Sequence, residues 1–374
     1  MKKVYITALH LLQGGAEQAI VNLANGLSKR GYQVTIWCIY RLGEPAYPLL
    51  PEVRVEYLTD CAPNREKFKS ALKGFRLLKV VKEGFGALKT LYLKRSSIIK
   101  CIKDTGEGII ISSRMEHNRY LARYGRQGVL KIGQYHYGDG FSKRLIRDMK
   151  GCYRGLDYFI VLNDILKAEA EKIMKSSHCR AEAIGNFLPE ELSERLQKEA
   201  QGKRERIIFS AGRLSYEKGY DRLIECFIKM KTKDCRLLIA GDGPEREKIE
   251  KMAGECENVH FLGMLGHREV LEYMNSSMLY ALPSRSEGFG YVIIEAQNAG
   301  LPVVSFDVPT GPQVLIRNGE NGILVKDGDT DAFAGAMDRL LADEKLRQEL
   351  AKAAQESVLE FSEEKIMDKW ERLF

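Results

Sequence analysis

Short apolar runs alternate with amphipathic segments through the second half of the chain, and this alternation limits the fold more than any other feature. Runs rich in branched and aromatic residues, as buried strands are, lie at 206–212, 235–241, 258–263, 278–284 and 302–307. Segments with helical spacing lie between them, such as 220–230 and a helix expected to have Pro244 at its first position. Strands that alternate with helices predict a parallel, doubly wound α/β sheet.

The first half repeats this pattern less cleanly. Strands are expected at 2–9, 33–40, 108–113, 129–136 and 158–163, and a glycine turn with a helix closed by Gly31 at 13–31. Because 374 residues exceed the size at which one core usually splits, we expect two domains. A polar segment at 183–205 marks the linker. The prediction is therefore two Rossmann-like domains, 1–187 and 188–355, facing a central cleft, with a final helix within 356–374 that crosses back to the first domain.

Composition excludes several classes of protein. No run of about 18 apolar residues exists to span a membrane, and the first residues lack a signal peptide's cleavage site. The eight cysteines contain no CxxC pair, so the spacing of a metal site is absent and reduced thiols are expected. These features favour a cytoplasmic protein.

Two cations lie in the loop after the expected strand 206–212, which reads "GRLSYEKG". Arg213 could hold a diphosphate with its planar guanidinium fork, and Lys218 could act as a point charge beside it. A solvated loop is the alternative reading of these two residues alone.

Two acids stand eight residues apart in "SRSEGFGYVIIEAQNAGLPVV". Glu287 lies in a glycine-flanked loop, where Gly288 and Gly290 would let backbone amides approach a phosphate at the start of a helix. Glu295 falls about two turns into that helix, within an apolar run. Carboxylates accept hydrogen bonds from vicinal sugar hydroxyls, so the pair could bind the two ends of a nucleotide-sugar.

Together these motifs resemble the retaining GT-B glycosyltransferases of family 4. The resemblance covers almost the whole chain and rests on the pair Glu287 and Glu295 before "NAGLPVV", supported in the family's order by "QGGAEQ", "GRLSYEKG", "AGDGPE" and "VHFLG". It implies transfer of a sugar, with retention, from a nucleotide diphosphate sugar. UDP is slightly favoured on general frequency alone. The acceptor would be a hydroxyl of a glycan, a lipid-linked molecule or a polymer. No cofactor and no metal are expected.

The resemblance also implies roles for individual residues. Glu287 would contact the donor sugar and Glu295 the ribose, while Arg213 and Lys218 would hold the diphosphate. The catalytic set would be Glu287, His136, Arg213 and Lys218. The donor-binding set would be Gly14, Gly15, Arg213, Lys218, Met264, Gly266, Glu287, Gly288, Phe289, Gly290, Tyr291 and Glu295. Gly14 and Gly15 would come from the first domain, and Met264 to Gly266 would contact the base.

His136 follows a strand of the first half and resembles the family's histidine near the donor sugar, although a lone histidine is more often structural. Tyr137 and Asp139 beside it could touch the acceptor. Asn186 resembles the family's hinge asparagine, with a turn residue as the equal alternative. Glu17 is expected in the first turn of its helix, where the helix dipole favours an acid.

A basic stretch at 65–103 holds twelve Lys and Arg against two acids. Apolar residues recur at helical spacing with basic residues between them: Phe68, Ala71, Leu72, Phe75 and Leu78, with Lys67, Lys69, Lys73, Arg76 and Lys79. Such a helix can lie on an anionic membrane. We therefore expect Lys67, Lys69, Lys73 and Arg76 to face an acceptor or the inner face of a membrane. A core-packed helix with a solvated basic face is the alternative, and nucleic acid is not expected beside the enzyme motifs.

Other functions remain open. Asp327, Asp329 and Asp331 suggest a divalent metal, but a turn followed by a helix N-cap explains them. Neither half contains G-x-G-x-x-G, which argues against a dehydrogenase. A nucleotide-sugar epimerase, a phosphorylase, or a non-catalytic glycosyltransferase-like subunit are the alternatives to a transferase.

Overall fold

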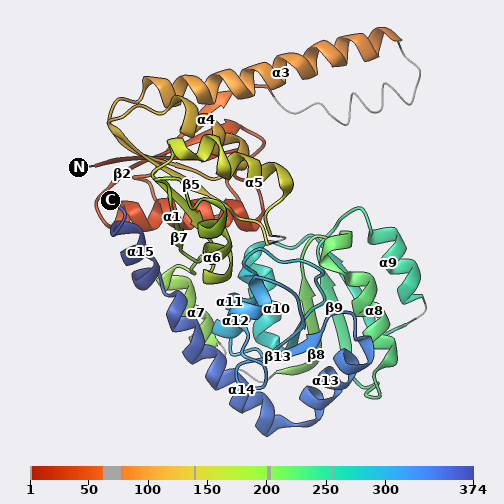
Figure 1. Cartoon of the computed structure of the whole chain (residues 1–374). Coiled ribbons are helices and arrows are strands. Elements are labelled where there is room, and N and C mark those ends of the chain that lie inside the picture. The colour runs from red at the N-terminus through yellow and green to blue at the C-terminus, as the bar shows by residue number, and fades with distance from the viewer. Residues whose placement is uncertain (1, 62–76, 139, 200–203, 255) are drawn as a thin grey trace. The chain divides into compact units, whose positions relative to one another are not determined.

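The computed structural model describes residues 2–61, 77–138, 140–199, 204–254 and 256–374. The chain forms two compact units. One comprises Met1–His136, Phe141–Ile184 and Met367–Phe374, and the other Tyr137–Gly140 and Gly185–Ile366. Each unit contains a parallel sheet flanked by helices (Figure 1).

The first unit's sheet has, among the described residues, seven parallel strands in the order β3-β2-β1-β4-β5-β6-β7. The strands are β1 (Lys3–Ala8), β2 (Gln33–Tyr40), β3 (Arg54–Thr59), β4 (Gly108–Ser112), β5 (Val129–Gln134), β6 (Tyr158–Val161) and β7 (Arg180–Ala183). The helices are α1 (Gly15–Lys29), α3 (Leu77–Asp104), α4 (Met115–Tyr124), α5 (Lys143–Lys150) and α6 (Asp164–Ile173). Helix α1 ends before Gly31, whose φ of +84° is the left-handed conformation that glycine adopts at low cost.

The second unit's sheet has the order β10-β9-β8-β11-β12-β13 and is also parallel. Its strands are β8 (Glu205–Ala211), β9 (Arg236–Ala240), β10 (Val259–Gly263), β11 (Ser277–Leu282), β12 (Val303–Asp307) and β13 (Ile323–Lys326). Its helices are α7 (Glu190–Glu199), α8 (Tyr220–Lys229), α9 (Arg246–Ala253), α10 (His267–Ser276), α11 (Tyr291–Asn298), α12 (Gly311–Leu315), α13 (Thr330–Ala342) and α14 (Glu344–Ser357). Leu237, Ile239 and Leu279 are fully buried in its core, against helices α8 and α13.

The strand order reverses at β8, which pairs with β9 on one side and with β11 on the other. In a doubly wound sheet a ligand binds beyond the carboxyl ends of the strands at such a reversal. The loops that follow β8 and β11 therefore meet at the position where this fold places a ligand.

The helix predicted to begin at Pro244 is displaced. Helix α9 begins at Arg246, two residues later, so the prediction that Pro244 occupies the first helical position is wrong. The backbone amide of Leu214 donates to the carbonyl of Asp242, and the amide of Glu245 donates to the carbonyl of Leu214. These bonds tie residues 242–245 to the loop after β8, so the helix cannot start until they end.

The C-terminal helix α15 (Glu363–Glu371) ends in the first unit. Met367 and Trp370 are buried there, and Arg30 at the end of α1 pairs with Asp368 at 2.6 Å and with Glu371 at 2.5 Å. The last turn of the chain is therefore part of the first unit's core and surface.

Helix α3 occupies the second part of the basic stretch, whereas Lys67, Lys69, Lys73 and Arg76 lie outside the described residues. Within the portion of the chain that is described, no helix is both long enough and apolar enough to cross a bilayer.

Candidate functional site

Two loops of the second unit bring predicted site residues together. The first runs from β8 to α8 and contains Lys218, and the second runs from β11 to α11 and contains Glu287. Between them, Gly219 has a φ of +69°, and a Cβ there would lie 2.2 Å from the carbonyl oxygen of Pro283. Only glycine allows the two loops to approach this closely.

Lys218 and Glu287 form an ion pair across these loops. The Lys218 Nζ lies 2.6 Å from the Glu287 Oε1, and the hydroxyl of Ser284 also donates to that oxygen at 2.6 Å. The side chain of Glu287 is only 6% exposed, while that of Lys218 is 30% exposed. The carboxylate is therefore fixed in a buried position, and the ammonium group keeps one side open to solvent.

The backbone of Glu287 is held by Thr310, a residue that the sequence reading did not single out. Thr310 is buried at the N-terminus of α12, and its hydroxyl donates to the Glu287 carbonyl. Among the residues that the structure covers, Thr310 is the one non-glycine residue with a positive φ, at +75°. Such strained residues cluster at binding sites, where the surroundings enforce them.

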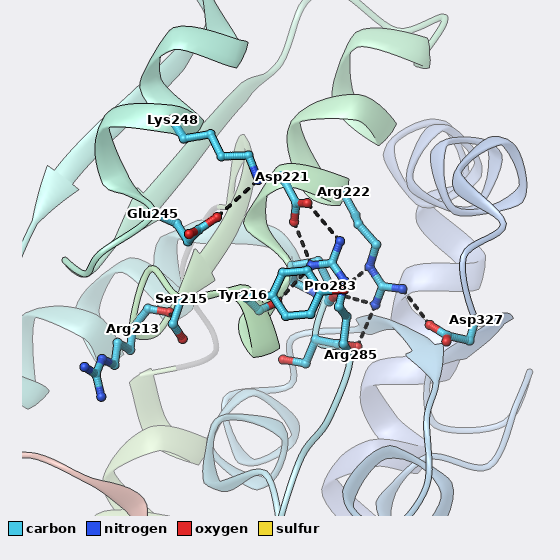
Figure 2. Close-up of polar contacts among 11 residues, drawn as sticks. Arg213, Ser215, Tyr216, Asp221, Arg222, Glu245, Lys248, Pro283, Arg285 and Asp327 are labelled. Atoms are coloured by element: carbon cyan, nitrogen blue, oxygen red, sulfur yellow. Dashed lines mark hydrogen bonds and ion pairs between the residues drawn. The ribbon is translucent and has the colours of Figure 1, made fainter. Parts of the chain in front are cut away.

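Arg285 joins the two loops a second time (Figure 2). Its guanidinium donates to both carboxylate oxygens of Asp221, each at 2.8 Å, and to the Tyr216 carbonyl, and it stacks over the Tyr216 ring at 4.3 Å. Burial alone raises the pKa of Asp221, but the hydrogen bonds and charge of Arg285 outweigh it and lower that pKa overall. The pair thus stays charged at neutral pH and clamps the loop before Glu287 to helix α8.

Arg222 completes this clamp from the next position of α8. It donates to the carbonyls of Pro283 and Ser284 at 2.7 and 2.8 Å and to Asp327 at 2.6 Å (Figure 2). Its guanidinium also lies over the ring of Phe306. The carbonyls at the start of the Glu287 loop are therefore paired before any ligand arrives.

Glu295 forms a second buried pair. It is the fifth residue of α11, a little over one turn in rather than the two turns expected, and its Oε1 lies 2.9 Å from the Nε2 of His267. His267 begins α10, directly after the segment of Met264 and Gly266 that was predicted to contact the base. Burial lowers the pKa of His267, but the hydrogen bond and charge of Glu295 raise it overall. Sequence reasoning missed His267, although its position next to Gly266 was available as a signal.

The start of α11 matches the predicted loop and helix. Gly290 caps the helix with a φ of +87°, which only glycine adopts without strain. The side chains of Phe289 and Tyr291 are buried, and Phe289 packs on Phe361 with ring centroids 5.5 Å apart. This leaves the backbone of the loop around Gly288, rather than the aromatic rings, to face a ligand.

Arg213 lies on the same loop as Lys218 but takes no part in the clamp. Its side chain is exposed, and in Figure 2 its guanidinium extends away from Asp221 and Arg285. Met264, after β10, is also largely exposed. Both therefore present surfaces on which a ligand could bind.

The predicted donor-binding and catalytic residues Gly14, Gly15 and His136 belong to the first unit. Gly14 caps α1 and Gly15 begins it, with Glu17 buried in its first turn as predicted. His136 follows β5, and burial together with the nearby charge of Arg114 lowers its pKa to about 4. Neither ring nitrogen of His136 has a hydrogen-bond partner among the described residues. The ring is therefore neutral at pH 7 with two unused polar atoms.

The remaining predicted positions are less informative. Tyr137 is exposed and Asn186 is half-buried near the start of the second unit's main segment. Asp139, like the four basic residues Lys67, Lys69, Lys73 and Arg76, lies outside the described residues.

Among the three acids near residue 329, the predicted N-cap is confirmed, and the other two acids form ion pairs that were not predicted. Asp329 caps α13 by accepting from the amide of Ala332, Asp327 pairs with Arg222, and Asp331 pairs with Lys229. Over the described ranges, no three His, Cys, Asp or Glu side chains are grouped to hold a metal ion.

Residues 193–357 match the family model for glycosyl transferases group 1. The chain is 25% identical over 363 residues to the amylovoran biosynthesis glycosyltransferase AmsD of Erwinia amylovora, covering 96% of this chain and 95% of that protein.

Solved structures match the whole chain. TarM of S. aureus, determined with UDP and alpha-GlcNAc-glycerol, aligns with a TM-score of 0.78 and 17% identity over 100% of this chain and 99% of that one. Sucrose-phosphate synthase of Thermosynechococcus elongatus aligns with a TM-score of 0.76 and 21% identity over 100% and 98%. The fold is therefore GT-B, built from two Rossmann-like units, as predicted.

Proposed function

We propose that the chain is a retaining glycosyltransferase that moves a sugar from a nucleotide diphosphate sugar to an acceptor hydroxyl. The observation that carries the proposal is the Lys218–Glu287 pair at the reversal point of the second unit's sheet. The match of residues 193–357 to the group 1 family model, and the UDP bound by the structurally similar TarM, support the nucleotide-sugar donor. UDP is the favoured nucleotide.

The buried acids suggest how the donor would be held. Glu287, fixed by Ser284 and Thr310, would accept hydrogen bonds from the donor sugar hydroxyls. Glu295 would accept from the ribose hydroxyls, beside the base-binding segment of Met264 to Gly266. A lysine ammonium has three donors, so Lys218 could keep Glu287 and still bind a phosphate oxygen.

The reaction would break the bond between the anomeric carbon and the diphosphate oxygen. The acceptor oxygen would bond to that carbon on the same face, and its proton would pass to the leaving diphosphate. Arg213, Lys218 and the amides at the start of α11 would stabilise the negative charge on that diphosphate, which is where charge develops. His136, neutral and with unused nitrogens, is the proposed partner for the donor sugar from the first unit, as Gly14 and Gly15 are for its phosphate.

We further propose that the reaction needs no metal or other cofactor and takes place in the cytoplasm. The acceptor would be a glycan, a lipid-linked molecule or a polymer. AmsD, which matches the chain along its length, is named for the biosynthesis of the polysaccharide amylovoran. Excess chelator should leave turnover intact, and loss of turnover with rescue by manganese would contradict metal independence.

Binding tests the donor directly. In a thermal-shift screen of nucleoside diphosphates and their sugars, a ligand at about 100 times its dissociation constant should stabilise the protein by roughly 2.7 kcal/mol. The expected result is a shift with one nucleotide and its sugars. A visible absorbance from bound pyridoxal phosphate would instead favour the phosphorylase alternative.

A further inference from the structure

Helix α3 exposes large apolar side chains in its N-terminal half and at its middle. Phe85 is 70% exposed, Leu88 64%, Leu91 61% and Tyr92 70%. Phe85, Leu88 and Tyr92 are spaced three and four residues apart, so they lie on one face of the helix, with Leu91 at the edge of that face. We call these four residues the α3 stripe. Contiguous exposed apolar residues on a protein surface mark a binding site more often than single ones do.

The stripe projects because the two halves of α3 have different surroundings. In the C-terminal half Ile98 and Ile102 are fully buried, and the helix packs there on α4, β2 and β3. The N-terminal half extends past this sheet (Figure 1). The stripe is therefore separate from the core that holds the helix in place, and substitutions in it should not disturb the fold.

Positive charge surrounds the stripe. Lys82, Lys89, Arg95, Lys100 and Lys103 are all exposed on this helix. A hollow of about 430 Å³ next to Tyr92 is lined by Arg95, Lys100 and Lys103, together with Ser96, Ile99 and Asp104. Arg95 and Lys103 lie over the rings of Tyr120 and Tyr124, and in the described part of the chain none of the three lining cations forms an ion pair with an acid. An anionic group could therefore contact three cations in this hollow, against one acid in its lining, Asp104.

We propose that this face of α3 docks on an anionic lipid bilayer, with the α3 stripe entering the headgroup region and the surrounding cations binding lipid phosphates. Apolar anchors flanked by Lys and Arg are the features that hold a helix in the plane of such a surface. The charge selects a bilayer over a second copy of the chain, because two copies meeting at this face would bring like charges together. A role for this surface in delivering the acceptor rests on the proposed function. The docking itself does not.

Co-sedimentation of the full chain with vesicles tests this proposal. The expected result is binding to mixed phosphatidylglycerol and phosphatidylcholine vesicles, little binding to phosphatidylcholine alone, and release by salt, since a Debye length shrinks to about 3 Å at 1 M. The stripe variant, with Phe85, Leu88, Leu91 and Tyr92 all changed to Ser, should lose about tenfold or more of the partition onto anionic vesicles.

The matched control changes three exposed apolar residues on other elements, Ile165→Ser, Ile228→Ser and Leu359→Ser, and should bind vesicles as the parent does. A charge variant, with Lys89, Arg95, Lys100 and Lys103 changed to Gln, should lose the preference for anionic lipid.

Each variant should keep its nucleotide-induced thermal shift, which separates a failure of docking from a failure of the donor site. Absence of binding to anionic vesicles at low salt would overturn the proposal. So would equal binding by the stripe variant, or a parent dimer that the stripe substitutions convert to a monomer in light scattering.

Discussion

The Nζ of Lys218 lies 2.6 Å from the Oε1 of Glu287, across two loops that follow neighbouring parallel strands. Lys218 is the residue proposed to bind the diphosphate, and Glu287 is the residue proposed to bind the donor sugar, so the two roles meet in one contact. The carboxylate of Glu287 is buried, whereas the ammonium of Lys218 is partly exposed. A phosphate can therefore reach the lysine more easily than the acid. The donor site therefore has its charges in position before the donor binds.

Removing the lysine tests its phosphate role. Lys218→Ala should weaken nucleoside diphosphate binding roughly tenfold to a hundredfold, because a charge-assisted hydrogen bond is worth about 1.5–3 kcal/mol. Lys248→Ala, which removes an exposed lysine paired with Glu245 on α9, is the matched control and should bind as the parent does. Isothermal titration with the diphosphate measures both, and equal affinities would remove Lys218 from the site.

Replacing Glu295 and replacing Glu287 should have different effects. Glu295→Ala should weaken binding of the free nucleotide, because the ribose hydroxyls lose a charged acceptor, again by roughly 1.5–3 kcal/mol. Glu287→Ala should lower kcat for transfer far more than it lowers nucleotide affinity, because it acts on the sugar. Steady-state kinetics beside titration separates the two effects, and parent-like turnover by Glu287→Ala would show that the roles are wrongly assigned.

The His267–Glu295 pair should make stability depend on pH. The folded-state pKa of His267 lies above its unfolded value, because Glu295 outweighs burial. The pair's contribution is therefore fully present below about pH 6.5 and is lost as pH rises through the raised pKa. His267→Gln lacks this charged pair at every pH. The free energy of unfolding of the parent should therefore exceed that of the variant at low pH and approach it at alkaline pH.

Urea unfolding at a series of pH values measures that convergence. His260→Gln, at an exposed histidine on β10, is the control and should follow the parent's profile. A constant difference between parent and His267→Gln at every pH would mean that the histidine does not titrate with its partner.

The Arg285–Asp221 clamp should affect both stability and donor binding. Arg285→Gln loses a bidentate contact between partly buried groups and should cost about 1.5–3 kcal/mol of unfolding free energy. It should also weaken nucleotide binding, since the Glu287 loop loses an anchor. Arg268→Gln breaks an exposed pair with Glu272 and should cost about 0.5 kcal/mol or less. Undiminished nucleotide affinity in Arg285→Gln would limit the clamp to a structural role.

Much of the second unit follows from its sequence, because its central strands β9, β8, β11 and β12 are largely buried and read as continuous apolar runs. The helix at Gly290 was predictable for a similar reason, since the glycines and the apolar run beyond them mark its start. Strands β3 and β7 of the first sheet and β13 of the second were not predicted. All three lie at sheet edges, and polar residues such as Arg54 and Glu182 hide the pattern in β3 and β7.

The partners within the site could not be read from the chain. Lys218 and Glu287 are 69 residues apart, and their contact depends on the strand order. The link between Glu295 and His267, and the positive φ of Thr310, likewise arise only when distant elements pack. For α3, periodicity placed the amphipathic segment at residues 67–79, of which only 77–79 belong to the described helix. The exposed stripe at 85–92 becomes visible only when burial separates it from Ile98 and Ile102.

Cleavage of a nucleotide-sugar donor is the sharpest test of the proposed sugar transfer. Phosphorus NMR can follow a UDP-sugar incubated with the full chain and a mixture of glycan and lipid acceptors, with Glu287→Ala in parallel. We expect the parent to release UDP and to form a product with the same anomeric configuration as the donor. The variant should release UDP far more slowly. Nucleotide-sugars that all remain intact, or a Glu287→Ala variant that releases UDP at the parent rate, would contradict the proposed sugar transfer.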